Sequence, residues 1–284
     1  MKKTKNKTTP NKQKKTTSSA AKKVVSKKAN AGTAASSKVR IVKNAKNKAV
    51  QQSIIQEKLN SGKKVVLHVG CGDKEVGSGL HEHFKNDEWE EIRLDIDPKV
   101  EPDIVASILD MSNIGDNLFD AVWSSHNIEH VFPHEAPKAL SEFYRVLKIG
   151  GFMLISAPDI QEVAEYICKK GLEAPIYNSP SGPIAPIDIL YGHIDSIKRG
   201  SIFMAHKGGF TANTLSQKMK AVGCLGIRVH REGVNLTAVG YKLAEKNEQN
   251  SKITIVGNDI NKMMARRDEI DQEPGNWPGL NFNK

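Results

Sequence analysis

The chain has 284 residues, of which 38% are hydrophobic and 26% charged, as expected for a soluble protein with one main core. Its net charge of +10 is uneven, because residues 1–50 hold 16 basic and no acidic residues, and the remainder carries 26 basic against 32 acidic side chains. The remainder is therefore net acidic, which argues against a broad basic nucleic-acid-binding face on a folded domain.

Residues 1–38 consist mainly of Lys, Thr, Ser, Asn and Ala and contain no aromatic residue, so they predict a disordered, Lys-rich arm. We interpret this arm as a solvated extension. The alternative is a weak, salt-sensitive contact with polyanions such as RNA, DNA or anionic lipid heads. Residues 39–61 follow with apolar side chains near the helical period, and Asn60, Ser61 and Gly62 end the pattern. This spacing predicts a leading helix.

From residue 62 to residue 243, short β-branched runs alternate with helical periods, which is the pattern of an α/β fold with a parallel sheet. The helical periods cover residues 75–84, 135–147 and 211–222, and the HEH sequence at 81–83 is expected on an exposed helix face. Predicted strands cover residues 65–69, 92–95, 104–106, 121–125 and 152–156.

The C-terminal third contains a long insertion and a hairpin. Residues 174–210 are rich in Pro and Gly but also contain Tyr177, Tyr191, His193 and His206, so we interpret them as a lid over the strand ends. Residues 227–230 and 236–241 predict an antiparallel hairpin at the sheet edge, turning at residues 231–233. Residues 244–284 predict a polar tail.

A glycine loop follows the first predicted strand in KVVLHVGCGDK, residues 64–74. Gly70 and Gly72 allow a tight turn in which backbone N–H groups approach a nucleotide-type ligand. The alternative is a strand-to-helix turn without a ligand. Glu75 stands where a dinucleotide fingerprint needs its third glycine, which disfavours a nicotinamide-dependent oxidoreductase.

Polar groups also follow later strands. LDIDP at 94–98 places Asp95 at the carboxyl edge of the sheet, where an acid accepts both hydroxyls of a ribose. SILDM ends the third strand, and FDAVWSSHNIEHV covers the fourth strand and its end. With FYRVLKIGGFMLISAPD at 143–159, these segments resemble the class I S-adenosylmethionine-dependent methyltransferases, in the type 11-like group, over residues 62–243.

The resemblance implies a Rossmann-like, mostly parallel seven-stranded sheet with an antiparallel last strand, and S-adenosyl-L-methionine as cofactor. By resemblance, the glycines line the methionine part, Asp95 binds the ribose, residues 109–111 frame the adenine and His126 lies beside the cofactor. The full set of expected cofactor-binding residues is His68, Gly70, Cys71, Gly72, Lys74, Asp95, Ile96, Leu109, Asp110, Met111 and His126.

Two residues depart from the family pattern. His68 occupies the place of the usual acidic residue, and Lys74 replaces the usual third glycine. As a hypothesis, the Lys74 ammonium pairs with the methionine carboxylate, and the alternative is a solvated side chain. The departures also keep open a non-catalytic methyltransferase-like binding module.

Methyl transfer from a sulfonium requires the protein to position the acceptor and, for a hydroxyl acceptor, to remove its proton. Histidine is the natural base near neutral pH, and the expected catalytic residues are His126, His193 and Tyr191. For His130 we prefer a capping or core role, and for Asp159 a helix cap. Pro133 argues against a shared helix for His126, His130 and His134, so no metal site is expected.

The predicted function is methyl transfer to a small-molecule or sugar-type acceptor, because the domain is acidic and contains no recognisable nucleic-acid module. The alternative enzyme is a nucleic-acid methyltransferase guided by the basic arm. No apolar run reaches the roughly 20 residues of a membrane span, and the three cysteines form no CxxC pair. We therefore expect a cytoplasmic location, and the sequence gives no indication of oligomeric state.

Overall fold

The computed structural model describes residues 49–74, 79–179 and 182–244. The predicted arm at 1–38 and nearly all of the predicted tail lie outside these ranges. Residues 49–59 are helical, within the range expected for a leading helix. None of the helices in the described residues is long and apolar enough to cross a membrane.

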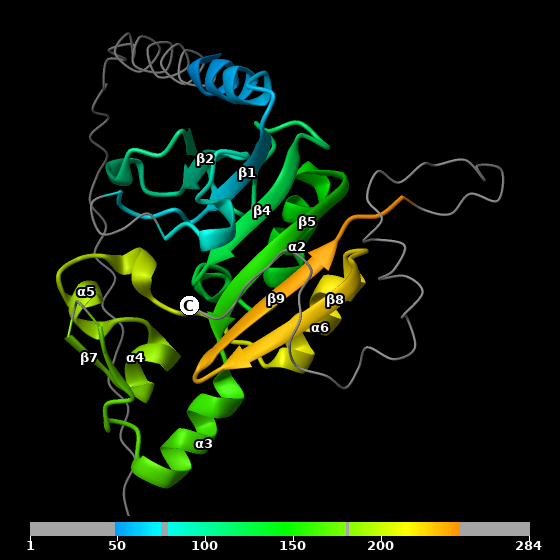
Figure 1. Cartoon of the computed structure of the whole chain (residues 1–284). Helices are drawn as coiled ribbons and strands as arrows, with labels where there is room; N and C mark the ends of the chain where they lie inside the picture. The colour runs from blue at the N-terminus through cyan, green and yellow to red at the C-terminus, as the bar shows by residue number, and fades with distance from the viewer. Residues whose placement is uncertain (1–48, 75–78, 180–181, 245–284) are drawn as a thin grey trace, which may run out of the picture. The chain divides into compact units, whose positions relative to one another are not determined.

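The centre of the fold is a seven-stranded sheet in the order β3-β2-β1-β4-β5-β9-β8 (Figure 1). Strands β1 to β5 run parallel to one another, and β9 runs antiparallel to both β5 and β8. This arrangement confirms the predicted Rossmann-like fold, including its antiparallel last strand. The bounds are β1 Lys64–Val69, β2 Trp89–Asp95, β3 Ile104–Val105, β4 Phe119–Ser125, β5 Leu147–Pro158, β8 Leu225–Glu232 and β9 Asn235–Tyr241.

Two hydrophobic clusters form on the sheet. The larger one alternates along β1 through Val65, Leu67 and Val69 and includes buried residues of α2 (Ala136–Val146) and α6 (Ala212–Ala221). Helix α2 presents Ala139, Leu140, Phe143 and Val146 to this cluster, which is the spacing of one helix face. The second cluster contains Val66 of β1, together with Phe84, Trp89, Trp123 and Leu154. The sheet is therefore buried on both faces, as a parallel sheet requires.

The remaining elements are short, apart from α3 (Ile160–Lys170). The 3-10 turns are η1 Glu82–Phe84, η2 Pro98–Val100, η3 Ile128–His130 and η4 Ile202–Met204. Within the predicted lid, β6 (Tyr177–Ser179) and β7 (Gly182–Ile184) form a small antiparallel sheet, followed by α4 (Pro186–Tyr191) and α5 (Ile194–Lys198). In Figure 1 these lid elements lie beyond the carboxyl ends of β4 and β5.

The predicted helix at residues 75–84 is wrong in its described part. Residues 79–80 are irregular, and only Glu82–Phe84 turns, as a 3-10 helix. The HEH sequence is also not a solvated helix face, because the His81 ring lies 5.2 Å from Trp123 and the His83 ring 5.6 Å from Trp89. Contacts with this aromatic cluster outweigh the local helical periodicity.

Strand β5 starts earlier than predicted, at Leu147, directly after helix α2. Gly150 and Gly151 therefore lie inside a strand and do not end a helix. A Cβ on Gly151 would lie 2.9 Å from the carbonyl oxygen of Asp120, so the missing side chain allows β5 to approach β4. The predicted terminal hairpin is confirmed, but β8 extends to Glu232, so the turn falls at residues 233–234.

Candidate active site

The glycine loop continues directly from β1 into the carboxyl edge of the sheet. Gly70 and Gly72 have φ values of +64° and +60°, which favour glycine. A Cβ on Gly70 would overlap the side chain of Asn127, whereas a Cβ on Gly72 would meet no described atom within 4 Å. Gly70 thus packs against the segment after β4, and Gly72 borders open space within the described structure.

Asp95 connects the end of β2 to the glycine loop. Its Oδ2 accepts a hydrogen bond from the Gly72 N–H at 3.0 Å, and its Oδ1 accepts one from the Asp97 N–H at 2.9 Å. Each carboxylate oxygen keeps a free lone pair for a further donor. Arg93, buried in β2, donates to the Gly72 carbonyl oxygen and thereby holds the loop from behind. Arg93 was not predicted from the sequence, where its only signal is a charged residue between the apolar residues Ile92 and Leu94.

The other residues predicted near this loop differ in their exposure. His68 is buried in β1, and its Nδ1 lies 2.7 Å from Glu91 Oε1. Cys71 is also buried, and burial raises the pKa of its thiol to about 12. Lys74 and Ile96 are exposed. His68 therefore supports the sheet behind the loop. Of the two residues that depart from the family pattern, His68 is buried and Lys74 is exposed to solvent.

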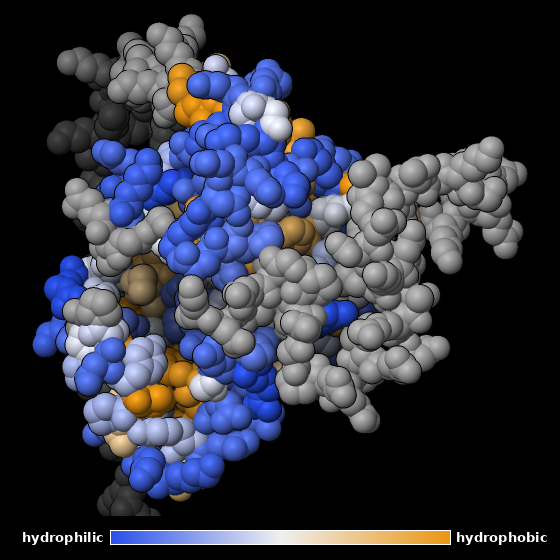
Figure 2. All heavy atoms as spheres, viewed as in Figure 1, coloured by the Kyte–Doolittle hydropathy of each residue, from blue (hydrophilic) through white to orange (hydrophobic). Residues whose placement is uncertain are grey.

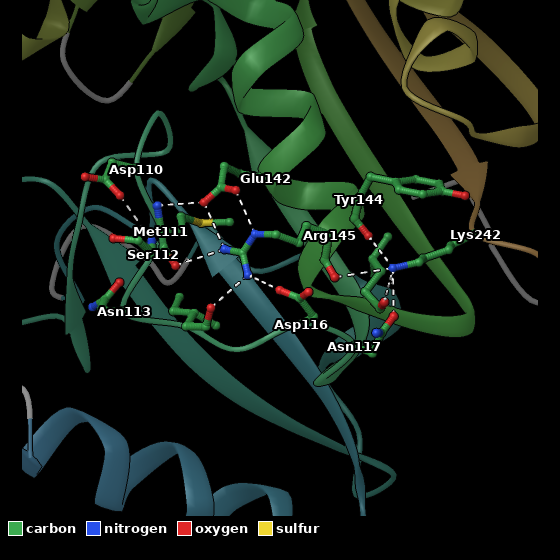
Figure 3. A network of polar contacts seen from close by, with 12 residues as sticks. Asp110, Met111, Ser112, Asn113, Asp116, Asn117, Glu142, Tyr144, Arg145 and Lys242 are labelled. Atoms are coloured by element: carbon green, nitrogen blue, oxygen red, sulfur yellow. Dashed lines mark hydrogen bonds and ion pairs between the residues drawn. The ribbon is translucent and has the colours of Figure 1, made fainter.

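The loop after β3 is held by a network from helix α2 (Figure 3). Arg145 donates to both carboxylate oxygens of Glu142, at 2.7 and 2.9 Å, and to the Met111 carbonyl oxygen at 3.0 Å. Glu142 also accepts from the Met111 N–H at 2.8 Å. The hydrogen bonds from Arg145, opposed by burial, lower the pKa of Glu142. The Met111 side chain lies in the core, while Leu109 is half-buried and Asp110 exposed.

The segment after β4 brings polar side chains to the same edge. His126 adopts φ +44°, a left-handed conformation that is uncommon outside glycine, and its N–H donates to the Ser156 carbonyl oxygen at 2.9 Å. Its side chain is 47% exposed. Asn127 has a buried Nδ2 with no hydrogen-bond partner among the described residues. Strained backbone and unpaired polar groups of this kind concentrate at functional sites.

A cavity of about 170 Å³ lies between the ends of β4 and β5, the terminal hairpin and the lid. Figure 2 shows hydrophobic surface over the lid elements α4 and β7. Of the predicted catalytic residues, His126 and His193 line the cavity, whereas Tyr191 is 62% exposed and lies outside its lining. The lining residues are His126, His130, Pro158, Tyr177, Ile184, Asp188, Ile189, His193, Met204, His206, Val234 and Asn235.

Three residues beside this cavity form a cluster that the sequence did not predict. Glu129, His130 and His206 each place one ligand-type atom within 4.8 Å of the others. Burial opposes ionisation of Glu129, but the imidazoles of His126 and His130 outweigh this effect, so the pKa of Glu129 is lowered. Burial also lowers the pKa of His206 and favours its neutral form. The partners are distant in sequence, so their proximity has no local signal.

Two acidic residues near the cavity have structural roles. Asp159 caps helix α3 by accepting from the Gln161 N–H at 3.1 Å, as predicted, and its Oδ2 accepts from Arg231 at 2.6 Å. Asp188 accepts from the backbone N–H groups of Ala185 and Ile194. Both carboxylates therefore hold the lid and its neighbours in place.

Comparisons with known proteins identify a domain within the described residues. The family model described as a methyltransferase domain matches residues 67–155, which run from β1 to β5 and include the glycine loop, Asp95 and the segment after β4. A comparison with curated proteins finds no match.

Similar solved structures include methyltransferases from several organisms. An S-adenosylmethionine-dependent methyltransferase from Archaeoglobus fulgidus has 16% identity and a TM-score of 0.42, covering 69% of this chain and 92% of that one. An O-methyltransferase family protein from Burkholderia thailandensis has 12% identity and a TM-score of 0.43, covering 72% and 60%. One from Methanosarcina mazei has 16% identity and a TM-score of 0.39, covering 68% and 98%.

The family match and the sheet agree with each other. The matched residues carry the motifs on which the resemblance rests, and the sheet has the predicted antiparallel β9 between β5 and β8. We conclude that residues 67–155 form a methyltransferase domain within a Rossmann-like sheet.

Proposed function

We propose that the chain transfers a methyl group from S-adenosylmethionine to a hydroxyl of a small-molecule or sugar-type acceptor bound in the cavity under the lid. The position of His126 carries this proposal. It lines the cavity, and its neighbour Asn127 packs against Gly70 of the glycine loop. A base at this position stands between the cofactor loop and the acceptor space.

The residues at the glycine loop fit the cofactor. The space beyond Gly72 admits a ligand that approaches the backbone. The buried Nδ2 atom of Asn127, which has no hydrogen-bond partner among the described residues, offers a donor beside the loop. Gly70, Cys71 and Gly72 would hold the methionine part, with exposed Lys74 within the same segment. Asp95, followed by Ile96, would accept the ribose hydroxyls through its free lone pairs. The cofactor supplies an electrophilic methyl carbon on a sulfonium.

The adenine would lie at the loop after β3. Leu109 and Asp110 have side chains available there, while Met111 would contribute only its backbone because its side chain is buried in the core. We assign His68 a supporting role, because it is buried against Glu91. These assignments keep the predicted position of the cofactor. Two predicted side-chain contacts change, because Met111 would contact the cofactor only through its backbone and His68 would only support the sheet.

His126 would remove the acceptor proton. Its Nδ1 lies 3.4 Å from Glu129 Oε1, so the carboxylate favours a proton on Nδ1 and leaves Nε2 as the acceptor atom. His193 also lines the cavity, and its Nδ1 lies 2.7 Å from Ser196 Oγ. We assign it acceptor positioning. Exposed Tyr191 would approach an acceptor only if the lid moved.

Transfer of a labelled methyl group tests this proposal. Wild type, His126→Asn and His134→Asn are assayed with labelled S-adenosylmethionine against hydroxylated small molecules, sugars and nucleic acids. His134 is a matched control because it is an exposed histidine outside the cavity lining. We expect hydroxyl methylation, with kcat lowered at least about 100-fold in His126→Asn alone and cofactor affinity retained. Transfer only to nucleic acid, lost on deletion of residues 1–38, would support the arm-guided alternative.

A further inference from the structure

We propose that Glu129, His130 and His206 bind one divalent first-row transition metal ion at the wall of the acceptor cavity, where the ion holds the acceptor hydroxyl. This inference rests on the proposed function for the identity of the bound oxygen, but the metal site itself stands on the geometry. Glu129 and His130 belong to η3 after β4, and His206 belongs to the lid.

The three side chains converge on one point. Their ligand-type atoms lie within 4.8 Å of one another, and the rings of His130 and His206 have centroids 4.8 Å apart. Zinc ligands lie about 2.0–2.2 Å from the ion, so a closure of roughly 1 Å by side-chain rotation would complete the site. Both histidines also line the cavity, so the ion would face the acceptor space.

Glu129 lacks the partners that a buried carboxylate needs. Its side chain is fully buried, and neither Oε1 nor Oε2 has a hydrogen bond among the described residues. The Nδ1 atom of His126 lies 3.4 Å from Glu129 Oε1, which is beyond ordinary hydrogen-bond length. Burying a carboxylate without such bonds is costly, and a bound cation offsets this cost.

The two imidazoles are already oriented as metal ligands. His130 Nδ1 lies 3.1 Å from the Ala205 carbonyl oxygen, and His206 Nδ1 lies 2.7 Å from the Ile189 carbonyl oxygen. A carbonyl only accepts, so each Nδ1 carries the proton and each Nε2 presents its lone pair. A backbone carbonyl on one ring nitrogen and a metal on the other is the usual arrangement of a histidine ligand.

The ligand set indicates the class of metal. Two imidazoles and one carboxylate suit Zn²⁺, Mn²⁺, Fe²⁺ or Co²⁺, whereas Mg²⁺ and Ca²⁺ prefer sites built from oxygen. Three protein ligands leave an open position for an acceptor oxygen. A Lewis acid at that position lowers the pKa of the bound hydroxyl, so that His126 can receive its proton.

Backbone hydrogen bonds hold the end of the lid segment beside Glu129. The backbone N–H groups of Lys207 and Gly208 both donate to the Glu129 carbonyl oxygen, at 2.9 and 3.0 Å. The residue after His206 is thus anchored on the residue that supplies the carboxylate. Metal binding would add a link between the lid and the end of β4.

Metal stoichiometry tests the site directly. The full chain is stripped with a chelator and dialysed against Zn²⁺ or Mn²⁺, and bound metal is quantified by atomic spectroscopy, with Co²⁺ absorption reporting the ligand field. Variants are Glu129→Gln, His206→Gln and the control His134→Gln. We expect about one ion per wild-type and control chain, and affinity at least about 100-fold weaker in the other two variants.

Thermal unfolding of the metal-free proteins provides a second readout. The metal-free forms give the baseline for each variant, and only wild type and His134→Gln should gain stability from added metal. Substoichiometric wild-type binding, equal affinity in all variants or equal loss in His134→Gln would overturn the inference. Calorimetry with S-adenosylmethionine on the same samples separates this failure from failure of the proposed function.

Discussion

The two glycines of the loop after β1, Gly70 and Gly72, have the same backbone conformation but different surroundings. Both have positive φ, yet only at Gly70 would a Cβ overlap another side chain, that of Asn127. Sequence alone indicated that both residues permit a turn. It did not indicate that Gly70 also makes room for the residue after β4, because that contact joins segments far apart in the chain.

Alanine substitution should separate these two roles. Both alanine substitutions place a Cβ on a left-handed backbone, which costs about 1–2 kcal/mol of stability. Only in Gly70→Ala does this Cβ also overlap the Asn127 side chain, which costs about 1–3 kcal/mol more. Urea unfolding should therefore show the larger loss for Gly70→Ala. Gly72→Ala should remain folded and weaken S-adenosylmethionine binding, because its methyl group occupies ligand space. Equal destabilisation by the two substitutions would contradict the packing role of Gly70.

The three cysteines should differ sharply in reactivity. Cys168 is exposed, whereas burial raises the pKa of both Cys71 and Cys224 to about 12. The thiolate is the reactive form, so iodoacetamide at about pH 8 should modify Cys168 alone in the native protein. Mass spectrometry of peptides measures this, with Cys168→Ser as the unlabelled control. Native labelling of Cys71 would contradict its burial.

The same pKa shifts give a direction for the pH dependence of stability. Unfolded thiols ionise near pH 8.5, but the buried ones stay protonated to about pH 12, so the unfolded state loses protons first as the pH rises. The free energy of unfolding should therefore fall as the pH rises above about 8.5. Cys224→Ala should reduce this slope in urea titrations, and an unchanged slope would contradict the shift.

At the scale of elements, helix α2 positions the loop after β3. Arg145 donates to Glu142 and to the backbone of that loop, and Glu142 accepts from the same loop (Figure 3). Arg145 lies in the FYRVLKIGG segment on which the family resemblance partly rests, and Glu142 directly precedes that segment. The contact depends on tertiary structure, so the motif alone did not indicate its role.

Arg145→Lys should loosen this loop. Lysine cannot reproduce the forked contacts of a guanidinium, so we expect a loss of about 1–3 kcal/mol in stability and about tenfold weaker S-adenosylmethionine binding. Hydrogen exchange should rise in residues 108–116. Lys85→Ala, which breaks an exposed ion pair with Glu82, should change stability by less than about 0.5 kcal/mol. Unchanged exchange in Arg145→Lys would contradict the account.

Other elements show where local pattern fails. The strands β1 to β4 were predicted within a few residues, because buried β-branched runs followed by polar residues are a strong local signal. The helix predicted over 75–84 failed because His81, His83 and Phe84 pack into aromatic contacts around Trp89 and Trp123. Strand β5 was predicted to begin at residue 152 but begins at Leu147, because the missing side chain of Gly151 permits close strand pairing.

For the whole molecule, the resemblance predicted a mostly parallel seven-stranded sheet with an antiparallel last strand, and the structure confirms both features. It did not predict the cavity wall. Glu129 and His130 follow β4, but His206 lies at the far end of the lid, and only the folded chain brings these residues together. His126 and His193, both predicted as site residues from the sequence, do line the cavity, whereas the cluster of Glu129, His130 and His206 has no local signal in the sequence.

Titration calorimetry with S-adenosylmethionine and S-adenosylhomocysteine tests the central claim most directly, with NAD as the control ligand. The proteins are wild type, Asp95→Ala and the exposed-residue control Asp87→Ala. The account predicts binding at about 1–100 µM to wild type and Asp87→Ala, at least about tenfold weaker in Asp95→Ala, and none of NAD. Folded wild-type protein that binds neither sulfur ligand would contradict it.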